Sequence, residues 1–263
     1  MAWVFCIEMV ACVAASLFHG VAALAGRVTL VGAGVGEVGS LTTTARDLLL
    51  SEHAVVVADR GLSQSVLGVV RGEVVWADHD RDLEDLVLSN VRQGRDVVRV
   101  LAGDPYLFGR GAQEVLEYKR HGITPTVVPG IPAALAAPLS ALVPLTHRDI
   151  ADQVLLVSEG LGSTGQERQC PPYRPGSSLV FVNAMGDLPS LCSRLLETGY
   201  PDLWAAAVEG SGTPEQHAVI GSLTTLPGLA SDHSMAKSSV VIVGDCVRAI
   251  HAGSWTGALP ERP

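Results

Sequence analysis

Short apolar runs, each closed by a turn and followed by a helical pattern, constrain the fold of this chain more than any other feature. The first run is Arg27–Gly32, with the sequence RVTLVG. Apolar runs bounded by glycine, proline or aspartate turns indicate strands that are buried on both faces. Strands that alternate with helices predict a mostly parallel sheet covered by helices. The predicted strands of the first half are Arg27–Gly32, Ala54–Ala58, Val74–Trp76, Asp96–Leu101 and Thr124–Val128.

Helical periodicity fills the intervals between these strands. The predicted helices are Leu41–Leu50, Ser63–Val69, Leu83–Gln93 and Gly111–His121. In a parallel sheet, the turns that follow the strands meet outside the carboxyl ends, where α/β proteins bind their ligands. We therefore expect a binding site at the edge where four turns converge: Gly32–Gly39, Asp59–Ser63, Ala102–Arg110 and Pro129–Ala133.

The second half of the chain repeats the mixture of strands and helices. An alanine-rich helix follows Gly130 and runs to about Leu142, and a polar stretch over Gly162–Ser177 indicates a surface loop. We expect two α/β domains over residues 26–129 and 130–250, preceded by an apolar extension (1–25) and followed by a polar tail (251–263). Further strands are predicted at Gln153–Ser158, Leu179–Asn183, Trp204–Val208, Ala218–Gly221 and Ser239–Val243, and helices at Asp187–Glu197 and Leu226–Ala230.

The apolar start of the chain allows three interpretations. It ends in Ala23-Leu24-Ala25, a pattern typical of signal cleavage, but it lacks a positively charged beginning, and Glu8 interrupts it. A signal peptide, a membrane anchor and an extension from a misplaced start codon all stay open. For the remainder of the chain we expect a cytoplasmic location.

Charge and cysteine spacing exclude several classes of function. The formal net charge is -9, and no block of lysine and arginine offers a surface for nucleic acid. The five cysteines form no CxxC pair and have no histidine at metal-ligand spacing, so neither a metal site nor a disulfide framework is expected.

Two glycine-rich turns are the candidate ligand-binding motifs. In the first, Gly34–Gly39 matches the GxGxxG pattern of dinucleotide-binding proteins, and Asp59 follows about 20 residues later. The strand, however, ends at Gly32, which places Glu37 where the third glycine belongs, so a nicotinamide or flavin site and a plain tight turn remain minor alternatives. The second turn, Gly103-Asp104-Pro105, leads to Arg110 at the start of a helix.

Taken together, five motifs in order resemble the tetrapyrrole methylase family, in particular its uroporphyrinogen-III C-methyltransferase branch. The resemblance covers nearly the whole chain outside the extension. The motifs are Gly32-Ala33-Gly34-x-Gly36, Leu41-Thr42, Gly103-Asp104-Pro105-x-x-Phe108-Gly109-Arg110, Val128-Pro129-Gly130 and Pro144-Leu145-Thr146-His147-Arg148.

The resemblance implies two αβα domains with the active site in the cleft between them, and usually a homodimer. S-adenosylmethionine would be the methyl donor, and a tetrapyrrole would lie above it. Arg60, Arg110 and Arg148 would pair with the carboxylates of the tetrapyrrole. The residues implied as cofactor contacts are Gly34, Val35, Ala102, Gly103, Asp104, Leu107, Pro132, Ala133, Met185 and Ser211.

The implied activity is methylation of uroporphyrinogen III to precorrin-2, on the way to siroheme or cobalamin. Asp59 would be the base, Arg71 the proton donor, and Arg110, Gln113 and Glu114 of FGRGAQE further catalytic residues. Glu114 should point about 100° away from Gln113 around the helix. Another precorrin methylase, a diphthine synthase-like enzyme and a catalytically weakened cofactor-binding homologue are the alternatives.

Several positions depart from the family pattern. Val35 replaces a proline, Ala102 the first of two glycines and Pro132 a cofactor-binding threonine. Gln113 replaces an acid, and a glutamine cannot act as a carboxylate base. These departures bear on activity rather than on the fold.

Overall fold

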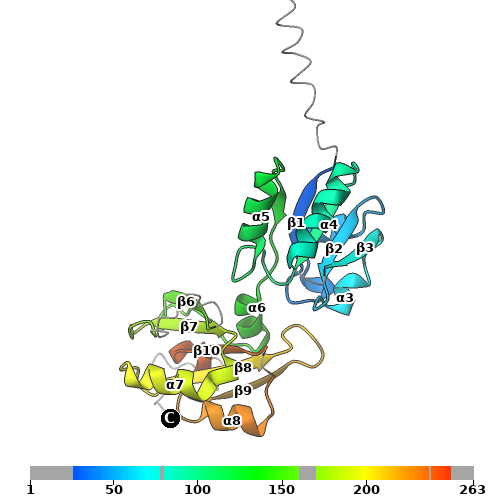
Figure 1. The fold of residues 1–263 in the computed structure, drawn as a ribbon. Helices are drawn as coiled ribbons and strands as arrows, with labels where there is room; N and C mark the ends of the chain where they lie inside the picture. The colour runs from blue at the N-terminus through cyan, green and yellow to red at the C-terminus, as the bar shows by residue number, and fades with distance from the viewer. Residues whose placement is uncertain (1–25, 78–79, 160–169, 237, 250–263) are drawn as a thin grey trace, which may run out of the picture.

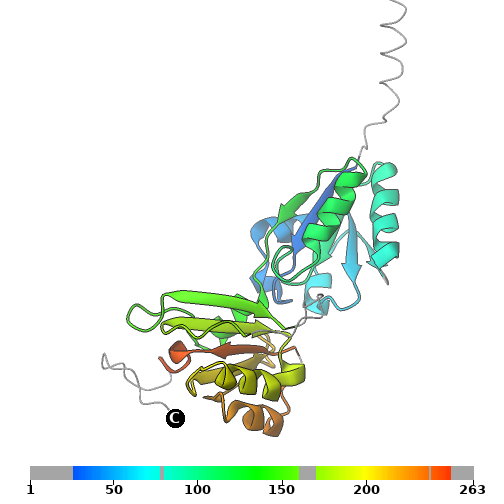
Figure 2. The ribbon, with the colours of Figure 1, turned by 60° about the vertical axis from the view of Figure 1, so that its left-hand side comes forward.

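The protein forms two α/β units, each built on its own five-stranded sheet. The computed structural model describes residues 26–77, 80–159, 170–236 and 238–249 (Figure 1). The predicted extension 1–25, the tail 251–263 and the first half of the predicted loop Gly162–Ser177 lie outside the described residues. Figure 2 shows the two sheets as separate bodies, and the chain passes between them once, from β5 to α6.

The first sheet is entirely parallel, with the strand order β3-β2-β4-β1-β5. The parallel sheet predicted from the apolar runs is therefore confirmed. Each predicted strand is present, with its bounds shifted by at most a few residues. The strands are β1 (Val28–Gly32), β2 (Val55–Asp59), β3 (Glu73–Ala77), β4 (Val97–Leu101) and β5 (Thr126–Val128).

Helices cover both faces of this sheet, because alternate side chains of each buried strand point to opposite sides. Val98 and Val100 of β4 pack with the helices of one face, whereas Val97 and Leu101 pack with those of the other. Thr42 caps the first helix, so the predicted Leu41–Leu50 helix begins two residues late. One face carries α2 (Thr43–Leu49) and α3 (Gln64–Leu67), and the other carries α4 (Asp80–Arg92) and α5 (Gly111–Arg120).

The second sheet has the order β6-β7-β10-β8-β9 and is mostly antiparallel. Only β6 and β7 run parallel to each other. Helix α6 (Ala133–Ser140) packs on one face, and α7 (Leu188–Glu197) and α8 (Leu226–Asp232) pack on the other, which completes a second αβα unit. The strands are β6 (Gln153–Ser158), β7 (Ser177–Val182), β8 (Trp204–Glu209), β9 (His217–Ser222) and β10 (Val240–Val243).

The turns at the carboxyl ends of β1, β4 and β5 touch through their backbones. The N–H of Ala33 donates to the carbonyl of Leu101 at 2.7 Å, and Gly34 and Gly103 exchange two hydrogen bonds at 3.1 and 2.8 Å. A Cβ atom on Gly130 would lie 2.2 Å from the carbonyl oxygen of Gly103 and 2.7 Å from the carbonyl carbon of Gly32. Glycine is therefore required at this crossing.

Replacing Gly130 by alanine should destabilise the fold by about 1–3 kcal/mol, the usual cost of forcing extra atoms into a packed site. The midpoint of urea unfolding measures the loss. Gly39→Ala is the matched control, because a Cβ at Gly39 meets nothing within 4 Å. Equal midpoints for the two variants would show that the turns can move apart freely.

Candidate active site

A cleft of about 350 Å³ lies between the two units. Its first wall comes from the four turns of the parallel sheet, and its second from the loop after β8, with Ser238. Ligand pockets commonly have this size and lie between domains. The convergence of turns predicted from the sequence is therefore present. Of the predicted cofactor contacts, the lining contains Gly34, Val35, Ala102, Gly103, Ala133 and Ser211.

The other predicted cofactor residues lie outside that lining. Asp104 holds two turns together, because its carboxylate accepts the backbone N–H groups of Tyr106 at 2.9 Å and Gly130 at 3.2 Å. Leu107 donates its N–H back to the Asp104 carbonyl, and Pro132 precedes α6 as its N-cap residue. Met185 packs against the core of the second unit. Direct contact of these four residues with a cofactor stays a prediction.

A second cavity, of about 480 Å³, adjoins the cleft and shares Ala102 with it. Its polar lining consists of Asp59 at the end of β2, Arg60, Arg99 and Arg110. Phe108, also in this lining, has a φ of 54°, a strained backbone conformation for a bulky side chain and one that clusters at functional sites. Arg60 and Arg110 are exposed, and two guanidinium groups at one cavity suit a ligand that carries carboxylates.

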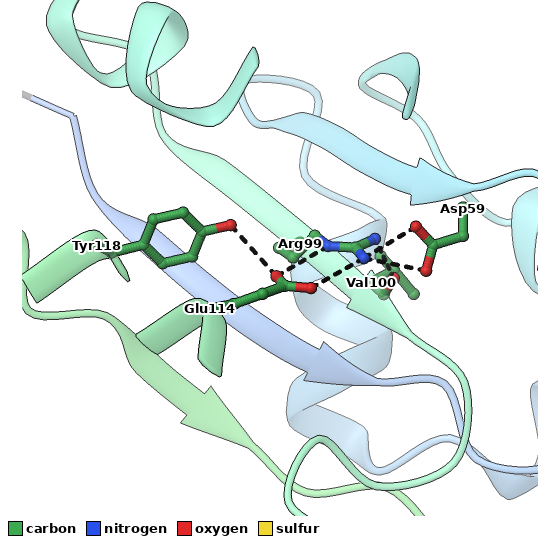
Figure 3. A network of polar contacts seen from close by, with 5 residues as sticks. All are labelled: Asp59, Arg99, Val100, Glu114 and Tyr118. Carbon is green, nitrogen blue, oxygen red and sulfur yellow. Dashed lines mark hydrogen bonds and ion pairs between the residues drawn. The ribbon is translucent and has the colours of Figure 1, made fainter. Parts of the chain in front are cut away.

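The carboxylate of Asp59 belongs to a network that runs from this cavity into the core (Figure 3). Arg99 Nη2 lies 2.9 Å from Oδ1 and 3.0 Å from Oδ2 of Asp59. The same guanidinium donates from Nε and Nη2 to the two carboxylate oxygens of Glu114, each at 3.1 Å. Tyr118 then donates its hydroxyl to Glu114 Oε2 at 3.2 Å. The network is buried at Arg99 and Glu114, whose side chains are 3% and 5% exposed. It reaches solvent at Asp59, whose side chain is 54% exposed.

Burial and the neighbouring charges together set the protonation of Arg99 and Tyr118. Burial alone would lower the pKa of Arg99, but the hydrogen bonds and charges of Glu114 and Asp59 outweigh it, so the pKa of Arg99 lies above its ordinary value. Burial, assisted by the charge of Glu114, also raises the pKa of Tyr118. Arg99 therefore stays charged, and Tyr118 keeps the proton that it donates.

The structure separates the predicted catalytic residues. Gln113 is exposed and Glu114 is buried, so the two side chains lie on different sides of α5. Their angular separation alone did not predict which of them faces the core. Gln113 and Arg110 line a smaller cavity beside α4. Arg148 lies exposed in a turn that a bridge between His147 and Ala151 closes, and its role as a substrate contact stays a prediction.

The resemblance implied that Arg71 is the proton donor, and this assignment is wrong. It precedes β3, at the amino end of the sheet, whereas Asp59 ends β2 opposite Ala77. The five residues of β3 span roughly 13 Å at about 3.3 Å per residue, so the two side chains lie at opposite ends of the sheet. Arg71 is therefore no proton donor for a reaction beside Asp59. The gapless alignment that suggested it ignored the parallel register.

The strand order also removes the dinucleotide alternative. Nicotinamide-binding sheets have the order 3-2-1-4-5-6, with β1 beside β2. Here β4 lies between β2 and β1. Helix α2 begins only at Thr43, and the glycine turn is followed first by the three-residue 3-10 helix η1 (Val38–Ser40), so no α-helix N-terminus directly follows the turn to receive a pyrophosphate.

Residues 27–227 match the family of Tetrapyrrole (Corrin/Porphyrin) Methylases. The chain belongs to this family. A siroheme synthase from Chromobacterium violaceum is 36% identical over 244 residues, which cover 88% of this chain and 52% of the relative. The chain thus spans about half the length of the curated relatives it matches.

Solved structures of the tetrapyrrole methylase family agree with the fold. The native form of a uroporphyrin III C-methyl transferase from Thermus thermophilus is 33% identical, with a TM-score of 0.75, over 89% of this chain and 97% of that one. A structure from the same organism complexed with S-adenosylhomocysteine is 35% identical, with a TM-score of 0.73, over 86% and 100% of the two chains. In the part of this methylase that the structure describes, no helix is both long and apolar enough to span a membrane.

Sequence reasoning missed Arg99, which occupies the centre of the site. The signal was present in VVRVL, where one arginine interrupts an otherwise apolar strand. A charged residue is almost never fully buried unless it has a partner. That interruption alone indicates a buried carboxylate nearby, although not which one.

Proposed function

We propose that this protein transfers methyl groups from S-adenosylmethionine to carbon atoms of uroporphyrinogen III and yields precorrin-2. Family membership and the similarity to uroporphyrin III C-methyl transferases support the proposal. The observation that carries it is the pair of adjoining cavities, one lined by glycines and one by arginines, with Ala102 in the wall of both. The siroheme synthases among the relatives favour siroheme as the end product.

The glycine-lined cleft fits the donor. The described residues that line it include no charged side chain, so the cleft offers no cation to a pyrophosphate and suits a nucleoside without phosphate groups. Gly34, Gly36 and Gly103 have positive φ angles, which other residues adopt only with strain. Such turns let backbone groups approach a ligand closely. When bound, S-adenosylmethionine supplies a methyl group already activated by its positive sulfur.

The arginine-lined cavity fits the acceptor. Arg60 and Arg110 can grip carboxylates of the tetrapyrrole in two places each, and Arg148 is proposed to add a third cation. The protein must align a pyrrole carbon with the donor and later remove a proton. Among the predicted catalytic residues, Asp59 alone presents an accessible carboxylate to this cavity, so we propose Asp59 as the proton acceptor.

A homodimer is part of the proposal. Apolar side chains lie exposed along α6 and in the turns before and after it, and two more lie exposed on β6, an edge strand of the second sheet. An edge strand beside an apolar patch is a common site of association. The exposed side chains are Ile131, Leu135, Leu139, Leu142, Val154 and Leu155.

S-adenosylhomocysteine should stabilise the protein, because a ligand that binds only the folded state at about 100 times its Kd adds about 2.7 kcal/mol. For a chain of this length the melting temperature should rise by roughly 5–10 °C. NAD and NADP serve as controls and should give no shift. Incorporation of labelled methyl groups into uroporphyrinogen III then separates the methylase from a cofactor-binding homologue. A shift with NAD and none with the thioether would contradict the proposal.

Asp59→Asn should lower the turnover of methylation about 10²–10⁴-fold, the usual worth of a general base, and leave the affinity for S-adenosylhomocysteine unchanged. Asp47→Asn is the matched control on the exposed surface of α2. Single-turnover rates and calorimetry measure the two quantities. If Asp59→Asn keeps the wild-type rate while Gln113→Glu exceeds it, the proton acceptor belongs at position 113 instead.

Leu139→Glu should shift the protein from dimer to monomer, because Leu139 is 77% exposed and belongs to the apolar patch on α6. Sedimentation velocity measures the mass. Leu116→Glu, at a 60% exposed leucine on α5, is the control that should stay dimeric. A monomeric wild-type protein would remove the homodimer from the proposal.

A further inference from the structure

Arg99 is a buried cation in the middle of an apolar strand, and stability does not explain it. Its neighbours on the same face, Val97 and Leu101, pack into the apolar cluster beneath α4 and α5. Taking a guanidinium out of water costs free energy that an ion pair often fails to recover, and a well-packed apolar side chain frequently serves the fold better. The arginine must therefore do something that leucine or methionine cannot do.

The inner part of the guanidinium is held in place on several sides. Glu114 engages Nε and Nη2 as a fork, and Nη1 donates to the carbonyl of Val100 at 2.9 Å. Tyr118, which is 1% exposed, holds Glu114 in turn. Because the guanidinium is planar, these bonds also fix the direction of the remaining N–H of Nη2. That group points to both oxygens of Asp59 (Figure 3).

We infer that Arg99 is a positioning residue that orients the carboxylate of Asp59 at the wall of the arginine-lined cavity. The inference rests on the proposed function, in which Asp59 takes the proton from the tetrapyrrole. Asp59 is half exposed and would otherwise rotate freely about its side-chain bonds. Contact with Arg99 leaves the outer lone pairs of Asp59 facing the cavity. Glu114 and Tyr118 act one step further away, by fixing Arg99, so Glu114 is not itself the proton acceptor.

A double-mutant cycle on turnover tests the inference. Lysine keeps the positive charge of Arg99, but its ammonium is a point charge and cannot replace the planar fork of N–H donors. Arg99→Lys should therefore lower kcat about 10–100-fold, the range that misplacement of a catalytic group produces. KM for uroporphyrinogen III and the Kd of S-adenosylhomocysteine should change little. In an Asp59→Asn background, Arg99→Lys should lower kcat less than about 3-fold further, because the group that it orients is already gone.

A second variant guards against a failure to fold. Arg99→Met/Glu114→Met/Tyr118→Phe removes the buried charges together and leaves apolar groups of similar size, an exchange that proteins often tolerate. It should unfold cooperatively in urea, bind S-adenosylhomocysteine like the wild type and lose turnover as Arg99→Lys does. Arg95→Lys, whose ion pair with Glu73 lies at the amino end of the sheet, is the matched control and should keep full activity.

The outcomes separate the inference from the proposed function. If the wild-type protein methylates uroporphyrinogen III, but the fold losses in kcat of Arg99→Lys and Asp59→Asn multiply in the double variant, the role of Arg99 alone is overturned. If neither Arg99→Lys nor the triple variant folds, the arginine serves the fold and the positioning role is overturned as well. A wild-type protein that binds the thioether but transfers no methyl group overturns the proposed function, and the role of Arg99 with it.

Discussion

The contact of three backbone turns at Gly32, Gly103 and Gly130 is the constraint on which the rest of the structure depends. These turns follow β1, β4 and β5, which lie side by side, so their contact fixes the carboxyl edge of the sheet. No side chain separates the turns, and the carboxylate of Asp104 ties the second turn to the third. The glycine-lined wall of the cleft is thus built from hydrogen-bonded backbone rather than from long side chains. A surface of this kind is already in place before a ligand arrives, which reduces the entropic cost of binding.

Beside this rigid edge, the network of Arg99 solves a different problem. A carboxylate that accepts a proton must be accessible to the substrate and yet hold one orientation. Asp59 meets both needs, because it sits at the last position of β2 and receives Nη2 of Arg99 from the buried side. Arg99 and Glu114 are both removed from water, and the attraction between their opposite charges offsets part of the free energy of desolvation. The departure at Gln113 leaves this arrangement intact, since Gln113 lies outside the network.

The sequence predicted the elements well because the signals for them are local. Short continuous apolar runs and the turns that close them located all five strands of the first sheet, and Thr42 explains why α2 starts late. Pairing between distant segments was beyond sequence reasoning. Arg99 and Asp59 lie 40 residues apart, and the choice of Glu114 over Gln113 as the buried partner depends on how α5 is rotated against β4. The antiparallel strands of the second sheet escaped prediction for the same reason, because a short apolar run carries no sign of its direction. Arg71 shows the opposite error, in which a position taken from an alignment conflicts with the parallel register.

The distribution of charge is compatible with the acidic substrate that we propose for this acidic protein. The whole chain carries a net charge of -9, which would repel a polycarboxylate at long range. At physiological ionic strength, however, charges more than about 8 Å apart are largely screened, so the far surface contributes little. In the proposed function, Arg60 and Arg110 would act at contact distance in the arginine-lined cavity, where the attraction is stronger. Recognition of the proposed substrate would then depend on the spacing of these guanidinium groups and not on the net charge of the whole protein. Among the described residues, the cleft proposed for the donor shares Ala102 alone with the arginine-lined cavity, so the arginines lie on the side where the carboxylates of the proposed acceptor would be.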